Sequence, residues 1–215
     1  MSQAPRFDDL VLAWASAACR DWGYPDLPSD FIEGVRKRLP SGVREALAVG
    51  LEQGAIISTG GHKFTLKDLA SGKGPYAWFS KSDRLVPAPN WEYFVQAAEY
   101  ARLYHSLASK DYQLVFEDDL MDIAVYQGGK LLVCVEVKEK ASQLPPLIAA
   151  IRSYEGGFDA SSPDRGNDGL RKAKYLVRSR PSFFALVAIG GRLEFNVSHP
   201  APGQFILTDD VIPIW

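Results

Sequence analysis

Two apolar segments that flank a pair of glycines form the clearest pattern in the chain. Residues 121–127 (MDIAVYQ) alternate around Ile123 and Val125, residues 128–129 are both glycine, and residues 130–138 (KLLVCVEVK) alternate again. Period-two alternation on both sides of a glycine turn is typical of a β-hairpin. We therefore predict two antiparallel strands joined at the glycines.

Three charged residues interrupt this otherwise apolar hairpin. Asp122 stands at the beginning of the first strand, and Glu136 and Lys138 stand at the end of the second. Charged side chains are seldom buried without a partner or a metal ion, so their convergence would indicate a site. A three-residue turn at 127–129 separates apolar from polar residues best, and it places all three charges on one face. A two-residue turn would place Asp122 on the opposite face from Glu136.

The first part of the chain has the apolar spacing of a helical module. Apolar residues recur at helical intervals in residues 7–20 and 42–53, and Ser41 is placed to cap the latter helix. Between them, residues 30–38 are expected to form another helix that stops before Pro40. Two short strands around a turn at 59–61 follow.

Three helices followed by a hairpin resemble a small winged-helix unit, and we expect the first domain at residues 1–70. The resemblance implies DNA contacts by Arg44 on the third helix and by His62 or Lys63 on the wing. The mixed charge of this segment leaves a scaffold or protein-binding role as the alternative. Residues 71–89 are rich in glycine, serine, proline and lysine, which predicts a linker in which some aromatic side chains pack down.

Residues 90–215 are expected to form a second domain of the α/β (α+β) class. Asn90 is placed to cap a long helix in which Glu92 and Glu99, seven residues apart, share one face. A strand, the hairpin described above, two helices and a continuous apolar strand at 182–191 follow. This order predicts a mixed sheet flanked by helices.

Charge restricts the kinds of partner that the chain can bind. The formal net charge is −2, so contact with nucleic acid requires a local basic patch. One such patch is a predicted helix at 169–180, whose basic residues are Arg171, Lys172, Lys174, Arg178 and Arg180. These residues would follow a phosphate backbone, and the alternative is that they only solvate one helix face.

Cysteine content and the length of apolar runs favour a cytoplasmic protein without membrane contact. The two cysteines, Cys19 and Cys134, lie far apart inside apolar segments, which is typical of reduced core thiols. The polar, acidic N-terminus lacks the pattern of a signal peptide, and no apolar run has the length needed to span a bilayer.

The second domain resembles the PD-(D/E)XK nuclease superfamily, whose fold is restriction-endonuclease-like. The resemblance rests on Asp122 at the start of the second strand and on the triplet at 136–138 (EVK) at the end of the third. A glutamate on the preceding helix, Glu99 or Glu92, completes the pattern. Met121 stands where the family often has a proline, at a position that varies within the family.

The resemblance implies a hydrolase that cleaves the phosphodiester bonds of DNA with Mg²⁺ or Mn²⁺. Asp122 and Glu136 would hold the metal ion together with the Val137 carbonyl, because hard cations prefer oxygen ligands. Lys138 would orient or deprotonate the attacking water and stabilise the transition state. The helical glutamate, Glu99 in the first instance, would bind a second metal ion or one of its waters.

Such an endonuclease, following its own DNA-binding module, would suit restriction, repair or defence against mobile DNA. Cleavage of both strands would favour a homodimer, and action within a complex with a protein partner is the alternative. The competing hypothesis is a catalytically silent nuclease-like fold that binds DNA or a protein.

Overall fold

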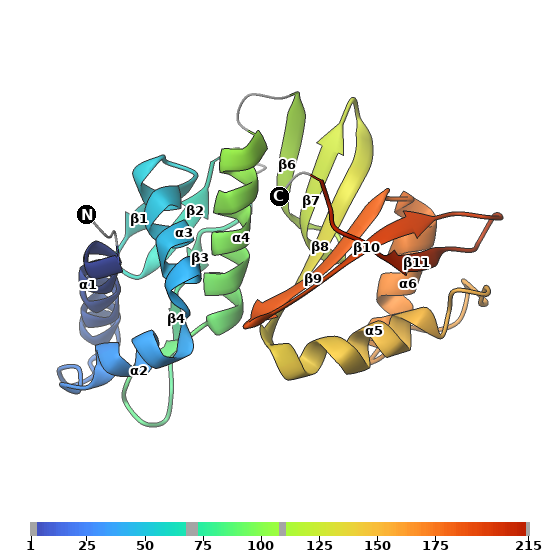
Figure 1. The fold of residues 1–215 in the computed structure, drawn as a ribbon. Helices are drawn as coiled ribbons and strands as arrows, with labels where there is room; N and C mark the ends of the chain where they lie inside the picture. Colours follow the sequence, from blue (N-terminus) through green and yellow to red (C-terminus); the bar gives the residue numbers. More distant parts are fainter. Residues whose placement is uncertain (1–3, 68–72, 108–110, 214–215) are drawn as a thin grey trace. The chain divides into compact units, whose positions relative to one another are not determined.

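The structure, a computed structural model, describes residues 4–67, 73–107 and 111–213 (Figure 1). The chain divides into two compact units, Met1–His105 and Ser106–Trp215, and each unit is described by itself. Both units contain helices and strands, so the class is mixed α+β, as the sequence predicts.

Unit 1 begins with three helices, at the positions that the sequence predicts. They are α1 (Ala4–Trp22), α2 (Phe31–Arg38) and α3 (Ser41–Glu52). In α1 the stripe of Phe7, Val11 and Trp14 is almost completely buried. The predicted cap of α3 is wrong, because Pro40 occupies the N-cap position and Ser41 is already helical. The ring of Pro40 fixes its φ at −56°, which holds the extended backbone that enters the helix.

The strands of unit 1 are short and lie partly in the segment that we predicted to be a linker. One antiparallel sheet contains β1 (Ile56–Gly60), β2 (Lys63–Leu66) and β3 (Tyr76–Ala77). A separate antiparallel pair contains β4 (Phe79–Ser80) and β5 (Ala88–Pro89). Trp78 lies between β3 and β4, is fully buried, and stacks on Phe64 and Trp14 at centroid distances of 3.8 and 5.1 Å. The aromatic residues of this segment therefore pack down as expected, and the segment is part of the fold.

Helix α4 (Trp91–Leu107) belongs to unit 1 as far as His105. We expected this helix to open the second domain at residue 90, and the boundary lies after His105 instead. The physical reason is an aromatic face on α4. Phe94 is fully buried, stacks on Trp78 at 4.8 Å, and meets the ring of Phe7 edge-on at 6.4 Å.

Unit 2 is built on a six-stranded mixed sheet with the order β11-β10-β9-β8-β7-β6. The strands are β6 (Tyr112–Asp118), β7 (Met121–Gln127), β8 (Lys130–Lys140), β9 (Phe183–Ile189), β10 (Gly191–Ser198) and β11 (Ile206–Asp209). Only β8 and β9 pair in parallel, and every other neighbouring pair is antiparallel. The mixed sheet expected from the order of elements is therefore present.

Two helices connect β8 to the parallel strand β9, as a parallel connection requires. After the short η1 (Ala141–Gln143), they are α5 (Leu144–Arg152) and α6 (Asp168–Ser179), and both lie along the same side of the sheet (Figure 1). Ile151 of α5 and Leu176 of α6 pack with Cys134 and Phe184 of the sheet in one buried cluster. A Cβ atom on Gly169 would lie only 2.7 Å from that of Ala150, so the close approach of α5 and α6 depends on this glycine.

The hairpin of β7 and β8 has a two-residue turn, so the predicted three-residue turn is wrong. Gln127 pairs with Lys130, and Gly128 and Gly129 both have positive φ, at +55° and +75°. Further from the turn, the register shifts between Tyr126 and Val125 through a β-bulge that leaves Leu132 without a partner on β7. The bulge compensates for the shorter turn.

Candidate active site

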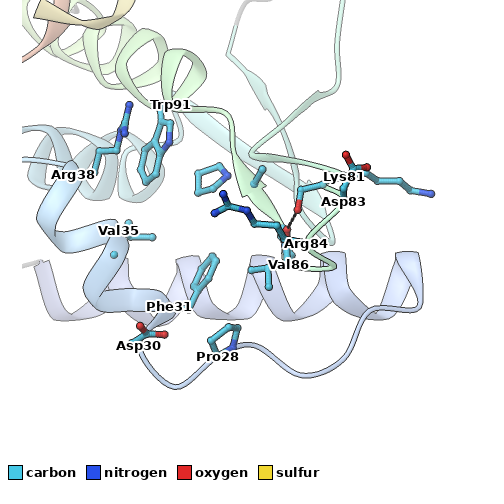
Figure 2. A pocket seen from close by; sticks show the side chains of 15 residues that line it. Pro28, Asp30, Phe31, Val35, Arg38, Lys81, Asp83, Arg84, Val86 and Trp91 are labelled. Carbon is cyan, nitrogen blue, oxygen red and sulfur yellow. Dashed lines mark hydrogen bonds between the residues drawn. The ribbon is translucent and has the colours of Figure 1, made fainter.

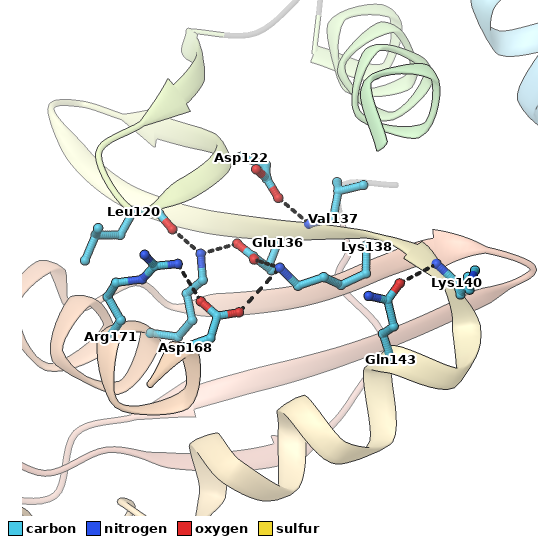
Figure 3. A network of polar contacts seen from close by, with 10 residues as sticks. Leu120, Asp122, Glu136, Val137, Lys138, Lys140, Gln143, Asp168 and Arg171 are labelled. Atoms are coloured by element: carbon cyan, nitrogen blue, oxygen red, sulfur yellow. Dashed lines mark hydrogen bonds and ion pairs between the residues drawn. The ribbon is translucent and has the colours of Figure 1, made fainter. Parts of the chain in front are cut away.

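Asp122 and Glu136 are brought to adjacent positions by the register beyond the bulge. Ile123 pairs with Val135, and the same register continued by one residue sets Asp122 opposite Glu136. The Asp122 carboxylate accepts a hydrogen bond of 2.5 Å from the backbone nitrogen of Val137. Figure 3 shows this carboxylate directed at the strand between Glu136 and Lys138. The acidic residue of β7 therefore reaches the triplet that ends β8.

Glu136 is buried between two ammonium groups. Its Oε1 atom lies 2.6 Å from Nζ of Lys138, and its Oε2 atom accepts from Nζ of Lys172 on α6. Glu136 and Lys172 are only 2% and 4% exposed, and Lys172 also donates to the carbonyl oxygen of Leu120. Burial of a charge is costly unless it is paired and hydrogen-bonded, and this arrangement satisfies both charges.

The polar network continues from Lys138 onto the first turn of α6. Nζ of Lys138 lies 3.4 Å from Asp168, which accepts a 2.7 Å hydrogen bond from Arg171 (Figure 3). Partial burial works to raise the pKa of Asp168, but the hydrogen bond from Arg171 and the nearby lysine charges outweigh it and lower that pKa. Asp168 is thus held as a carboxylate that positions Lys138.

Opposite charges balance within this group of side chains. The carboxylates belong to Asp122, Glu136 and Asp168, and the cations belong to Lys138, Arg171 and Lys172. A balanced set of this kind is stable without a further ion. It also means that an added cation would compete with the ammonium groups for the carboxylate oxygens.

The oxygen donors of the site have the chemistry that hard divalent cations require. Lys172 already places a positive charge between the Glu136 carboxylate and the Leu120 carbonyl, so these oxygens hold a cation in the folded protein. Asp122, Glu136 and the Val137 carbonyl are the residues that would hold Mg²⁺ or Mn²⁺. Over the residues that the structure describes, no group of three or more histidine, cysteine, aspartate or glutamate side chains gathers as a metal site.

A second polar cluster joins β6, β7 and α6. The Oδ2 atom of Asp118 accepts hydrogen bonds from the hydroxyl groups of Tyr126 at 2.6 Å and Tyr175 at 2.9 Å. Burial and then the hydrogen bond to Asp118 raise the pKa of Tyr126 to about 12. Burial also raises the pKa of the Cys134 thiol, which is therefore a core thiol and not an activated nucleophile.

The basic residues of α6 are mostly engaged in ion pairs within unit 2. The pairs are Arg171–Asp168, Lys172–Glu136, Lys174–Asp164 and Arg178–Asp119. Arg180 is exposed and forms the C-cap, with a φ of +49°. The helix is therefore less free to follow a phosphate backbone than its composition suggests, and Lys172 is turned into the candidate site.

The remaining predicted site residues belong to unit 1. Glu99 is fully buried and pairs with Arg102 at 3.1 Å, whereas Glu92 is exposed in the first turn of α4. Arg44 is only 16% exposed and lies 3.5 Å from Asp8, so it is packed and not presented on a surface. Lys63 is exposed on β2. The assignment of the helical glutamate to the site stays a prediction.

Sequence reasoning missed the inward role of Lys172 and the participation of Asp168. A signal for both was present. On α6, Lys172 falls at helical spacing within the buried stripe of Gly169, Ala173 and Leu176, and Asp168 lies one turn before it. A lysine on the apolar stripe of a helix needs an acidic partner, and a search for that partner leads to Glu136.

No protein-family model matches the chain, and neither a curated protein nor a solved structure is significantly similar to it. None of the helices in the described ranges is long and apolar enough to cross a membrane.

Proposed function

We propose that this protein is a metal-dependent endonuclease that hydrolyses phosphodiester bonds of DNA at Asp122, Glu136 and Lys138. The observation that carries the proposal is the hydrogen bond between the Asp122 side chain of β7 and the backbone of β8. The Asp122 carboxylate lies on the backbone of the triplet that contains Glu136 and Lys138, 15 residues away in sequence. Three consecutive antiparallel strands, followed by helices and a parallel strand, surround it in the order that the nuclease resemblance implies.

The metal ion, when bound, would neutralise charge that develops on the phosphoryl oxygens and lower the pKa of an attacking water. Asp122 and Glu136 supply the carboxylate oxygens, and their positions are fixed before any ligand arrives, by Val137 and by the two lysines. Fixed charges of this kind stabilise a transition state without the cost of reorganisation.

Lys138 is placed to act on the nucleophile or on the phosphate. Its ammonium lies between the carboxylates of Glu136 and Asp168. The Lys138 side chain is 20% exposed, so it is accessible to solvent although its partner Glu136 is buried. A lysine in this position can orient a water molecule and donate to a phosphoryl oxygen. Glu136, at 2.6 Å, and Asp168, at 3.4 Å, together set its direction.

The test is cleavage of supercoiled plasmid DNA with Mg²⁺ or Mn²⁺, with EDTA as the blank. We expect Glu136→Gln and Lys138→Ala each to reduce the rate by at least about 100-fold, as removal of groups that stabilise a transition state does. Glu139→Gln and Lys140→Ala, on the same strand, are the matched controls and should cleave as the unmodified chain does. If Glu136→Gln and Lys138→Ala cleave normally, the site is wrongly assigned.

A second candidate function is favoured by one observation at the same site. Both oxygens of the Glu136 carboxylate are already occupied by ammonium groups. A fold whose site is permanently filled in this way would bind DNA or a protein partner without cleaving. This function replaces the first if the unmodified chain neither cleaves nucleic acid nor binds Mn²⁺.

The cellular setting follows only from the proposed activity. An endonuclease with its own helical module would suit restriction, repair or defence against mobile DNA in the cytoplasm. Cleavage of both strands would be served by a homodimer or by a protein partner.

A further inference from the structure

Unit 1 contains a cavity of about 830 Å³ that the proposed active site does not use. It opens between α2, the loop at 81–87 and the start of α4, and every lining residue belongs to unit 1. A volume of this size is in the range of small-molecule sites, which run from roughly 300 to 1,000 Å³.

Aromatic and apolar side chains form the walls of the cavity. Phe31 and Trp91 line it, and both are only half-buried, so part of each ring faces the open space (Figure 2). The guanidinium carbon of Arg38 lies 5.0 Å from the centroid of the Trp91 ring. Exposed aromatic rings beside arginine are the surfaces on which unpaired bases stack.

Charged residues of both signs line the cavity, and Arg84 is a cation that faces it (Figure 2). Three cations, Arg38, Lys81 and Arg84, line it with two acids, Asp30 and Asp83. Figure 2 shows the guanidinium of Arg84 extending into the cavity, whereas Lys81 points away from it. Throughout the described part of the chain, the Arg84 guanidinium has no hydrogen-bond or ion-pair partner, so its donors are available to an anion.

The loop that carries Arg84 is held in place from within unit 1. The hydroxyl of Ser82 donates to the Val86 carbonyl at 2.6 Å, and the hydroxyl of Tyr24 bonds both the carbonyl and the amide of Ser82, at 3.0 and 3.2 Å. The backbone of the loop that carries Arg84 is therefore held before a ligand binds, which reduces the entropic cost of ordering the loop.

We propose that this cavity binds an unpaired nucleotide, with the base against the aromatic wall of Phe31 and Trp91 and a phosphate at Arg84. The wall accepts a flat ring, and the guanidinium of Arg84 binds an anion. A base inside a duplex is stacked and unavailable, so single-stranded DNA is bound in preference to duplex. The choice of nucleic acid among anionic aromatic ligands rests on the proposed function. The binding itself does not depend on cleavage.

The experiment measures fluorescence anisotropy of a short fluorescein-labelled oligodeoxynucleotide, with the full chain in EDTA so that no cleavage occurs. Single-stranded DNA should bind about tenfold more tightly than the duplex of the same sequence. Arg84→Ala and Trp91→Leu should each weaken single-strand binding by about tenfold, and Arg84→Ala should also reduce the salt dependence. Lys37→Ala is the matched control, since Lys37 is exposed on α2 and does not line the cavity.

Competition experiments identify the ligand. Displacement of the oligonucleotide by dAMP would assign the cavity to a free nucleotide, and displacement only by unlabelled oligonucleotide would assign it to a strand; both support the proposal. Displacement by polyglutamate as effective as that by single-stranded DNA would indicate an acidic protein partner and overturn it.

Arg84→Ala replaces an exposed side chain, so folding is preserved. Single-strand binding by Arg84→Ala equal to that by Lys37→Ala would also overturn the proposal, whereas a chain that binds but does not cleave overturns only the proposed endonuclease.

Discussion

The ammonium group of Lys172 and the carboxylate of Glu136 form an ion pair in which the side chains are only 5% and 3% exposed. The two residues lie 36 positions apart in sequence and come from α6 and β8. Lys172 also donates to the Leu120 carbonyl, so one side chain connects the helix to β8 and to the turn between β6 and β7. Removal of one partner leaves the other charge buried, and this is the costly event in such pairs.

We expect Lys172→Met to lower the free energy of unfolding by about 3 kcal/mol. This value is at the lower end of the range for removal of one partner from a buried ion pair, because Lys138 remains beside Glu136. Glu136→Gln should lower the free energy of unfolding by at least about 1 kcal/mol less in the Lys172→Met chain than in the unmodified chain, since the two charges are coupled. Urea unfolding followed by tryptophan fluorescence measures both quantities.

The matched control for Lys172 is Arg178, another basic residue of α6. Its ion pair with Asp119 is exposed, at 62% and 51%, so Arg178→Met should change the free energy of unfolding by less than about 1 kcal/mol. Equal losses for Lys172→Met and Arg178→Met would mean that the buried pair contributes no more than a surface pair.

The turn between β7 and β8 gives a second prediction. Gly129 has a φ of +75°, where a side chain is strained, so Gly129→Ala should lower the free energy of unfolding by about 1 kcal/mol. Gly156→Ala is the control, because Gly156 has no positive φ and a Cβ atom there would meet nothing within 4 Å. Thermal unfolding of the two variants compares them directly. A Gly129→Ala chain as stable as Gly156→Ala would contradict the strained turn.

The same hairpin shows how far sequence reasoning reaches. Its two strands are predictable, because alternation and paired glycines are local signals. The turn length is not, since the bulge at Leu132 offsets a two-residue turn and nothing in the local pattern requires a bulge. The Pro- and Gly-rich composition of 71–89 likewise predicts a linker, while the burial of Trp78 depends on Trp14 and Phe64, which are distant in sequence.

The candidate site follows the same division. The grouping of Asp122, Glu136 and Lys138 on one hairpin can be predicted, because these residues belong to adjacent strands. On α6, the apolar stripe marks Lys172 as a buried lysine that needs an acidic partner, whereas nothing in the local pattern marks Arg178 as the partner of Asp119. Long-range pairing determines whether a basic helix presents charge or buries it.

The cluster of Tyr126, Tyr175 and Asp118 predicts a loss of stability at high pH. Burial, followed by the hydrogen bond to Asp118, raises the pKa of Tyr126 from 10.0 to about 12, and burial also raises that of Tyr175. Between these two values the unfolded chain loses a phenolic proton that the folded chain keeps. Rising pH therefore favours unfolding. The stabilisation that protonated Tyr126 gives to the folded chain is complete below pH 10 and is lost as the pH passes 12.

Urea unfolding at about pH 9 and about pH 11 measures this decline. Tyr126→Phe should make the free energy of unfolding fall less steeply between the two conditions. Tyr112→Phe serves as the control, since Tyr112 lies outside the Asp118 cluster. An equal decline in the Tyr126→Phe and Tyr112→Phe chains would show that Tyr126 is not the group responsible.

Asp122 has two roles that one pair of substitutions separates. As a hydrogen-bond acceptor, it holds the backbone nitrogen of Val137 at 2.5 Å, and as a carboxylate it supplies charge to the proposed metal ion. An amide oxygen also accepts a hydrogen bond, so Asp122→Asn should lower the free energy of unfolding by less than about 1 kcal/mol, while Asp122→Ala should lose more.

Cleavage of plasmid DNA distinguishes the charge of Asp122 from its structural contact. Asp122→Asn should reduce Mg²⁺- or Mn²⁺-dependent cleavage by at least about 100-fold although it folds normally, because a neutral amide is a poor ligand for a hard cation. Asp119→Asn is the control, since Asp119 is exposed and its ion pair is with Arg178, so its cleavage should be unchanged. Full activity in Asp122→Asn would restrict Asp122 to holding the β8 backbone, and the metal site would then have to lie elsewhere.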